Sequence, residues 1–266
     1  IGEEAFRDCE ALASVSIPPS CELIEAEAFL DCRALTSLTL AEGVRNIGDS
    51  AFRDCRALAS LSLPTSLDSI GAFAFHLCSS LTSVTIPDGL TSIGEAAFAY
   101  CLQLSTITVD PGSADFSSVG GVLFHASQDF LVQYPIARAG SYSIPAGVTS
   151  VGSWAFAYAD ELTGITIPAG VESIGDSSFR NCVELTVVNL PAGATSIGAS
   201  AFERCWMLTG VGVPNSVVSI GAAAFKQCQG LTSINIPQGI VRIEDSTFSW
   251  CRKLTSVTIP NGVTYI

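Results

Sequence analysis

The sequence predicts an α/β solenoid of ten 23-residue repeats, with a parallel β-sheet on one face and short helices on the other. The first observation is a phenylalanine that recurs every 23 residues within two blocks. The second is a leucine six positions after each of these phenylalanines, from Leu12 to Leu254. The third is a gap of 58 residues between the blocks, which equals one period plus 35 inserted residues. The ten repeat phenylalanines are Phe6, Phe29, Phe52, Phe75, Phe98, Phe156, Phe179, Phe202, Phe225 and Phe248.

Each repeat begins with a segment that has the apolar spacing of a short helix. In the fifth repeat, Ala97, Cys101 and Leu104 recur at i, i+4 and i+7. This spacing places them on one face of one or two helical turns. We therefore expect a short helix at each Ala-Phe-x-x-Cys segment.

The next segment of each repeat has the alternation of a strand. Val84 and Ile86 alternate with polar residues, and Pro87 ends the strand because proline cannot donate to a β-ladder. A glycine-containing turn and a second apolar pair, such as Val44 and Ile47, complete the repeat. One repeat cannot cover its own apolar side, whereas stacked repeats form a continuous core. We expect all ten repeat phenylalanines to be buried in that core.

An insertion after the fifth repeat divides the solenoid. The predicted organisation is a first repeat block at 1–109, a β-hairpin insertion at 110–141 and a second repeat block at 142–266, together forming one continuous domain. Two apolar runs, Val122–Phe124 and Phe130–Tyr134, flank a polar turn and are read as the hairpin strands. The insertion is either an aberrant repeat that keeps the core covered or a projecting recognition element.

The composition favours a well-packed core and disfavours nucleic acid as a partner. The chain carries a formal charge of −13, and phosphate binding needs clustered cations. No apolar run approaches the ~20 residues that span a bilayer, so no membrane insertion is expected. The sequence opens and closes within the repeat pattern without a polar cap. We expect both ends to continue into further repeats or another chain.

The repeat phrase LTSVTIPDGLTSIGEAAFAYC (Leu81–Cys101) and its relatives resemble the BspA-like leucine-rich repeats. Proteins of that subfamily occur on the surface of bacteria and some protists. The resemblance covers nearly the whole chain. It implies a right-handed leucine-rich-repeat superhelix and a cell-surface or secreted location.

Cysteine also recurs with the repeat and is predicted to pack rather than to react. Ala159 takes the cysteine position in the sixth repeat, and Cys21 stands where other repeats have valine or leucine, so the position suits a small buried hydrophobe. Parallel side chains in a stack do not face one another as disulfides require, and no Cys-x-x-Cys pair suggests zinc. The cysteine ladder consists of Cys9, Cys32, Cys55, Cys78, Cys101, Cys182, Cys205, Cys228 and Cys251.

No group of residues suggests catalysis, so we expect a protein that is not an enzyme, with no cofactor and no bound metal. His76 occupies a column that holds Arg7, Arg53 and Lys226 elsewhere, which predicts a surface position. His125 falls in the turn of the inserted hairpin. The motifs of the common hydrolase, nucleotide-binding and zinc-protease families are absent.

The helix side carries the candidate partner-binding residues. Apolar side chains replace polar ones there in the repeats that flank the insertion, and exposed apolar groups in one region suggest a partner surface. Alternatively, the hairpin folds over them. The candidates are Phe73, Leu77, Tyr100, Leu102, Trp154 and Tyr158, with further apolar substitutions at Trp206, Met207 and Trp250.

The strand face is the rival surface. Its outward columns are hydroxylic, which would suit a glycan or ice but offers none of the aromatic anchors that dominate protein interfaces. These columns hold Ser14, Ser37, Ser60, Ser83 and Thr106, and Ser16, Thr39, Ser62, Thr85, Thr108 and Thr166.

The function predicted from these features is a non-catalytic, protein-binding module of an adhesin-like surface or secreted protein. The alternative is a structural or scaffold subunit of a larger assembly, for which an intracellular location stays open. A third hypothesis is glycan or ice binding through the strand face. The sequence does not identify the partner.

Overall fold

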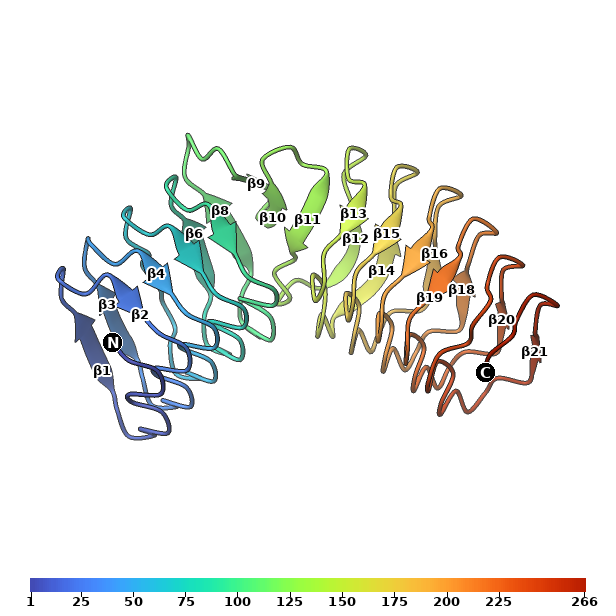
Figure 1. Ribbon diagram of the computed structural model, residues 1–266, viewed down its shortest axis with the longest axis horizontal. Helices are drawn as coiled ribbons and strands as arrows, with labels where there is room; N and C mark the ends of the chain where they lie inside the picture. Colours follow the sequence, from blue (N-terminus) through green and yellow to red (C-terminus); the bar gives the residue numbers. More distant parts are fainter. The chain divides into compact units, whose positions relative to one another are not determined.

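The computed structural model describes all 266 residues as a series of stacked coils (Figure 1). The chain divides into two compact units. The first comprises residues 1–127 with 133–137, and the second comprises residues 128–132 with 138–266. The boundary therefore falls inside the predicted insertion, and a single continuous domain stays a prediction.

The longer strands pair in parallel two by two along each unit, and their row is called here the long-strand ladder (Figure 1). They are β1 (Ser14–Ile17), β3 (Ser37–Leu40), β6 (Ser83–Ile86) and β8 (Thr106–Val109) in the first unit, and β12 (Gly140–Ser143), β14 (Leu162–Thr166), β16 (Val187–Asn189), β18 (Gly210–Gly212), β20 (Ser233–Asn235) and β21 (Ser256–Thr258) in the second. Paired residues are 23 positions apart, as with Ser14 and Ser37. In β3 and β6, exposed and buried side chains alternate, so one face lies on the core. The predicted parallel sheet is confirmed.

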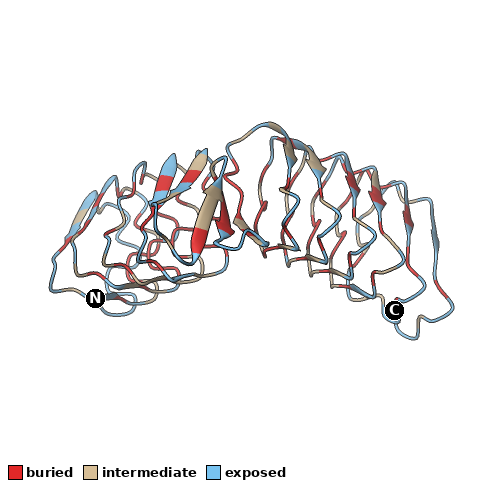
Figure 2. Ribbon diagram, turned by 90° about the horizontal axis from the view of Figure 1, so that it is seen from above, coloured by how far each residue is buried: buried red, intermediate tan, exposed pale blue.

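A second set of very short parallel strands forms a short-strand ladder. It contains β2 (Leu23–Ile24), β4 (Asn46–Ile47), β5 (Ser69–Ile70) and β7 (Ser92–Ile93) in the first unit, and β11 (Phe130–Gln133), β13 (Ser150–Val151), β15 (Ser173–Ile174), β17 (Ser196–Ile197) and β19 (Ser219–Ile220) along the second. The sequence showed these segments only as a second apolar pair. Their isoleucines and valines point into the core, and Figure 2 shows buried residues along both ladders.

The predicted short helices are wrong. The Ala-Phe-x-x-Cys segments are runs of tight turns, and the chain has no helix that could cross a lipid bilayer. Phe6 N–H donates to the Ala28 carbonyl of the next coil (2.7 Å), whereas Arg7 N–H donates to the Glu4 carbonyl of its own turn (3.0 Å). The repeat phenylalanines of these turns stack with ring centroids 4.9–5.8 Å apart. An α-helix about 10–12 Å across does not fit this spacing, whereas a narrow turn does.

Two residues in each of these turns have left-handed backbone conformations, with φ between 52° and 65°. They lie two positions before and two positions after the repeat phenylalanine. The first left-handed row is Glu4, Glu27, Ser50, Phe73, Ala96, Trp154, Ser177, Ser200, Ala223 and Ser246. The second left-handed row is Asp8, Asp31, Asp54, Leu77, Tyr100, Tyr158, Asn181, Arg204, Gln227 and Trp250. Asp and Asn tolerate this conformation, whereas other non-glycine residues pay about 1–2 kcal/mol.

Replacing Ala223 (φ 55°) with glycine should stabilise the second unit by about 0.5–1 kcal/mol. Glycine removes the conformational cost of the left-handed backbone, and this gain is larger than the free energy lost through the greater entropy of the unfolded chain. The neighbouring Ala222→Gly serves as control, since Ala222 is not left-handed and should lose stability. Urea unfolding of the two variants measures the difference. Equal destabilisation by both would show that the turn is not strained.

The core of each unit is a column of stacked rings and aliphatic side chains. In the first unit, Phe29 stacks on Phe52 with ring centroids 5.1 Å apart and planes within 2°. Eight of the ten repeat phenylalanines are fully buried; Phe6 is 43% exposed and Phe248 is half-buried. The expectation that all ten are buried is therefore wrong at the first and last coils, where no second neighbour covers the ring.

The insertion contributes structure to both units. Within the first unit, β9 (Phe116–Val119) and β10 (Val122–His125) form an antiparallel hairpin around Gly120 and Gly121. The strand β9 was not predicted. In the second unit, Phe130 and Leu131 of β11 pair in parallel with β13, and β12 pairs in parallel with β14. Much of the insertion thus supplies a further coil of the stack, while the pairing of 122–124 with 130–134 stays a prediction.

Candidate partner-binding surface

Four of the six candidate residues belong to the first unit and two to the second. Leu102, just after a turn, is 39% exposed. The other five are half-buried, and all of them occupy the left-handed rows: Phe73, Leu77, Tyr100, Trp154 and Tyr158. The rows are mainly acidic in the first three coils, with Ser50 as the exception, and mainly large and apolar in the three repeats around the insertion, with Ala96 as the exception.

The aromatic residues stand in a conformation that aromatic residues seldom adopt. Phe73 has φ 57°, Tyr100 has φ 62° and Trp154 has φ 61°. A bulky side chain in this region is a true outlier, and it costs about 1–2 kcal/mol. Such strain, where it persists, motivates a hypothesis of function.

In the first unit, His76 lies between two of the candidate rings. Its ring meets Phe73 edge-on at 5.5 Å and Tyr100 at 6.2 Å between centroids. The expected surface position of His76 is wrong, because these neighbours leave it only 9% exposed. Burial, and secondarily the charge of Arg53, lowers the pKa of His76 from 6.5 to about 4. The imidazole is therefore neutral near pH 7.

This buried histidine predicts a loss of stability in acid. Its folded-state pKa lies below the unfolded value of about 6.5, so its contribution is complete above that pH and is lost as the pH falls toward 4. The free energy of unfolding in urea should drop by up to about 3 kcal/mol over this window. His76→Leu should reduce this acid-induced decrease in the free energy of unfolding, because leucine does not titrate. Leu30 shows that the column accepts a buried leucine. The control His125→Gln, at an exposed position, should leave the decrease unchanged.

In the second unit, Trp154 begins a line of interactions across successive coils. The Arg180 guanidinium lies 5.7 Å from the Trp154 ring centroid. Arg180 also pairs with Glu203 at 3.5 Å, and Lys226 pairs with the same carboxylate at 3.3 Å. Glu203 is buried, with 4% exposure, so its charge depends on these two cations. These contacts connect the Trp154 side chain to the two coils that follow it.

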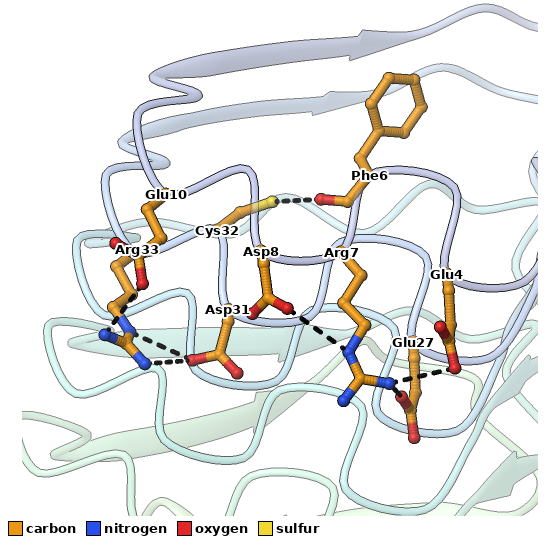
Figure 3. Close-up of polar contacts among 9 residues, drawn as sticks. All are labelled: Glu4, Phe6, Arg7, Asp8, Glu10, Glu27, Asp31, Cys32 and Arg33. Carbon is orange, nitrogen blue, oxygen red and sulfur yellow. Dashed lines mark hydrogen bonds and ion pairs between the residues drawn. The ribbon is translucent and has the colours of Figure 1, made fainter.

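In the first two coils the left-handed rows belong to a charged network and hold no aromatic residue (Figure 3). Arg7 pairs with Glu4 at 3.0 Å and with Glu27 at 2.6 Å. Arg33 pairs with Asp31 at 2.8 Å and with Glu10 at 3.1 Å. These pairs are largely exposed, so solvent screening leaves them little net effect on stability. Their charges already satisfy one another, which makes this part of the turn side a poorer anchor for a partner.

The strand face presents its hydroxyl columns to solvent as predicted, with Thr106 only half-exposed. Thr85 and Thr108 share a hydrogen bond of 2.9 Å across neighbouring strands. Beside this face, Thr186 and Thr209 donate to carbonyls of the preceding coil, at 3.3 and 3.1 Å. These hydroxyls mainly connect coils.

The structure brings no catalytic group of side chains together. His125 is exposed, and its ring lies edge-on to Phe116 at 6.0 Å, beside a depression of about 340 Å³ that Asp115 also lines. No group of three or more His, Cys, Asp or Glu side chains is arranged to hold a metal ion.

The cysteine ladder has a specific bonding pattern that the sequence did not reveal. From the second coil onward, the thiol donates to the repeat phenylalanine carbonyl of the preceding coil, as Cys32 does to Phe6 at 3.2 Å (Figure 3) and Cys205 to Phe179 at 3.1 Å. All ten thiols are free. Burial raises the pKa of Cys101 to about 12. The thiol form therefore persists at neutral pH, and the geometry supports the predicted packing role.

Three large apolar residues outside the six candidates are more exposed than any of the six. Trp206 is 46% exposed, Met207 is 51% exposed and Trp250 is 60% exposed. The sequence signal was present, because these residues also replace polar ones. Two adjacent cations that were not predicted as part of a surface, Arg252 and Lys253, lie two and three positions after Trp250.

Comparisons with known proteins agree on the repeat type. The family model described as BspA type Leucine rich repeat region (6 copies) matches residues 1–129 and 149–266. No curated protein sequence matches.

Solved bacterial structures share the fold. A leucine-rich repeat protein from Eubacterium ventriosum has 22% identity and a TM-score of 0.75, covering 95% of this chain and 80% of its own. The pneumococcal vaccine antigen PcpA has 22% identity and a TM-score of 0.75, covering 95% and 73%. A leucine rich cell surface protein from Faecalibacterium prausnitzii has 26% identity and a TM-score of 0.66, covering 97% and 75%.

Proposed function

Since the chain belongs to the family of BspA-type leucine-rich repeats, we propose that it is a non-catalytic module that binds a protein partner on its turn side. Repeat solenoids use their extended surfaces for binding, and each coil adds a row of side chains to that surface. The contact residues in this proposal are Phe73, Leu77, Tyr100, Leu102, Trp154 and Tyr158.

The observation that carries the proposal is the aromatic content of the left-handed rows. Asp and Asn occupy these rows in other coils at lower conformational cost, so the turn does not require the aromatic rings of Tyr100, Trp154 and Tyr158. Trp and Tyr are favoured anchors where an interface excludes water. Binding energy from a partner would compensate the strain.

We further propose that the module works at the cell surface or after secretion, in adhesion. The support is the similarity to the cell surface protein of Faecalibacterium prausnitzii, at 26% identity over 97% of this chain. Antibodies to the chain should then label intact, unpermeabilised cells of its host. Labelling only after permeabilisation would favour the structural or scaffold alternative within the cell.

The binding surface is tested by two matched double variants. The immobilised chain captures partners from extracts of surface and extracellular proteins, and each identified partner is then titrated individually. Trp154→Ala with Tyr158→Ala should weaken binding by about 2 kcal/mol, or roughly 30-fold, because two central anchors are lost. Thr85→Ala with Thr108→Ala is the control on the strand face and should change the dissociation constant little.

The reverse result would place the site on the strand face. Loss of binding with the threonine pair, and none with the aromatic pair, contradicts the proposal and favours a ligand of the hydroxyl columns, such as a glycan or ice. Far-ultraviolet circular dichroism of all variants separates lost contacts from lost folding.

A further inference from the structure

A depression of about 520 Å³ lies in the second unit, where the turns lead into β18, β20 and β21. Figure 1 labels these three strands near the C-terminus. Its size falls in the range of ligand sites, about 300–1,000 Å³. Three successive coils supply its lining, chiefly Trp206 and Met207, then Gln229 and Gly230, then Arg252 and Lys253. We refer to it as the Trp206 depression.

The middle coil of the depression lies close to the coil that carries Trp206. Gly230 is buried and occupies a column in which the two flanking coils have Met207 and Lys253. A Cβ atom there would lie 2.9 Å from Trp206 O and 3.0 Å from Leu208 O. Glycine therefore permits this close packing, and the middle coil adds no long side chain between Met207 and Lys253.

One wall of the depression is apolar and open to solvent. Trp206 and Met207 are each about half exposed, at 46% and 51%. Exposed apolar groups that cluster on a folded surface usually mark an interaction site. Thr209 and Gln229 add a hydroxyl and an amide at its edge.

The opposite wall is cationic. Arg252 and Lys253 are exposed, and neither forms an ion pair, whereas Arg180, Lys226 and Arg242 of the same unit all do. The Arg252 guanidinium lies 5.2 Å from the Trp250 ring centroid, which orients it without neutralising it. In a chain of net charge −13, two adjacent unpaired cations form a local site for negative charge.

We propose that the Trp206 depression binds an acidic segment of a protein partner that carries one apolar side chain. The apolar side chain packs against the exposed Trp206 and Met207. Carboxylates of the segment pair with Arg252 and Lys253, with the planar guanidinium suited to a bidentate contact. The site is separate from the candidate surface at Trp154, so either can exist without the other.

The residue types favour a peptide over other anionic ligands. Trp, Met and Arg are the side chains enriched in the cores of protein interfaces. Nucleic acid is disfavoured because the rest of the chain is acidic and would repel a phosphate backbone. An acidic sugar would also match the cations, and the experiment therefore includes one.

The test is selection of a phage-displayed library of random octapeptides on the immobilised, intact chain. Selected sequences should be enriched in Asp and Glu next to one aromatic or aliphatic residue. A synthetic peptide of the leading sequence should bind at least tenfold more weakly to Arg252→Gln/Lys253→Gln and to Trp206→Ala. Its affinity for the unaltered chain should fall as salt rises.

A charge-matched control is available in the other unit. Arg33→Gln/Arg56→Gln removes the same two positive charges from exposed positions and should leave peptide binding unchanged. The proposal is overturned if no acidic peptides are enriched. It is also overturned if the enriched peptides bind the Arg252/Lys253 and Trp206 variants as tightly as the unaltered chain. Binding of sialyllactose through these residues in the absence of peptide binding overturns it as well. Because Trp206, Arg252 and Lys253 are exposed, thermal unfolding should show that their variants fold.

Discussion

Replacing Gly175 with alanine is expected to destabilise the second unit by about 3 kcal/mol or more. A Cβ atom there would lie 2.6 Å from Ser153 N, 2.7 Å from Gly152 C and 2.8 Å from Val151 O. All three atoms belong to the backbone of the preceding coil, which cannot move without breaking the short-strand ladder between β13 and β15. Overpacking of this kind forces backbone shifts. Urea unfolding of the intact chain measures the loss.

The same column shows what happens where glycine is absent. Glu25 and Glu244 occupy it in the second and tenth repeats. The short-strand ladder begins at β2, beside Glu25, and it ends at β19, before Glu244, with only an isolated bridge from Arg242 to Tyr265 beyond. The matched control is Gly210→Ala, because an added Cβ meets nothing within 4 Å. A similar, small effect of both variants would mean that the coils are not held at close backbone contact.

Replacing Phe179 with alanine should cost about 3–5 kcal/mol. The ring is fully buried and stacks on Phe156 at 4.9 Å and on Phe202 at 5.2 Å between centroids. Its loss removes apolar burial and leaves a cavity in the stack. Because each coil contacts only its neighbours, the variant weakens both interfaces of one coil. Hydrogen exchange should therefore show the largest loss of protection in the coils of Phe156, Phe179 and Phe202.

Cys205→Ala tests the cysteine ladder at the neighbouring position. It should cost only about 1 kcal/mol, since it removes one weak thiol hydrogen bond to the Phe179 carbonyl and Ala159 already fills this position in the sixth repeat. That carbonyl keeps the hydrogen bond that it accepts from Cys182 N–H. A loss as large as that of Phe179→Ala, or disulfides found by counting thiols in the folded protein, would contradict a packing role.

Repetition in the sequence was sufficient to predict the stack, its parallel strands and its buried columns. A period of 23 residues with apolar positions in constant register can bury its hydrophobic side only by placing equivalent residues next to one another. The registers of Ser14 with Ser37 and of Ser233 with Ser256 follow from that period alone. The six candidate partner residues were likewise found by their departure from the column pattern.

Tertiary contacts determined three features: the conformation of the turns, the strand pairing of the insertion and the burial of His76. Apolar spacing at Ala97, Cys101 and Leu104 fits a helix as well as a tight turn, and single-chain periodicity does not distinguish them. Alternate amides of these turns donate to the neighbouring coil, as Phe75 N–H does to the Ala97 carbonyl at 2.8 Å. A helix would use those amides within its own segment.

The difference between the two kinds of feature has one physical origin. Burial of an apolar column is set by residue type and spacing, which the sequence states directly. The path of the backbone between columns is set by the distance at which coils meet, about 5 Å between stacked rings such as Phe6 and Phe29. That distance admits a narrow, partly left-handed turn and excludes a helix, and it brings Phe73 and Tyr100 close enough to bury His76. Since the spacing arises only when coils pack together, no single repeat contains it.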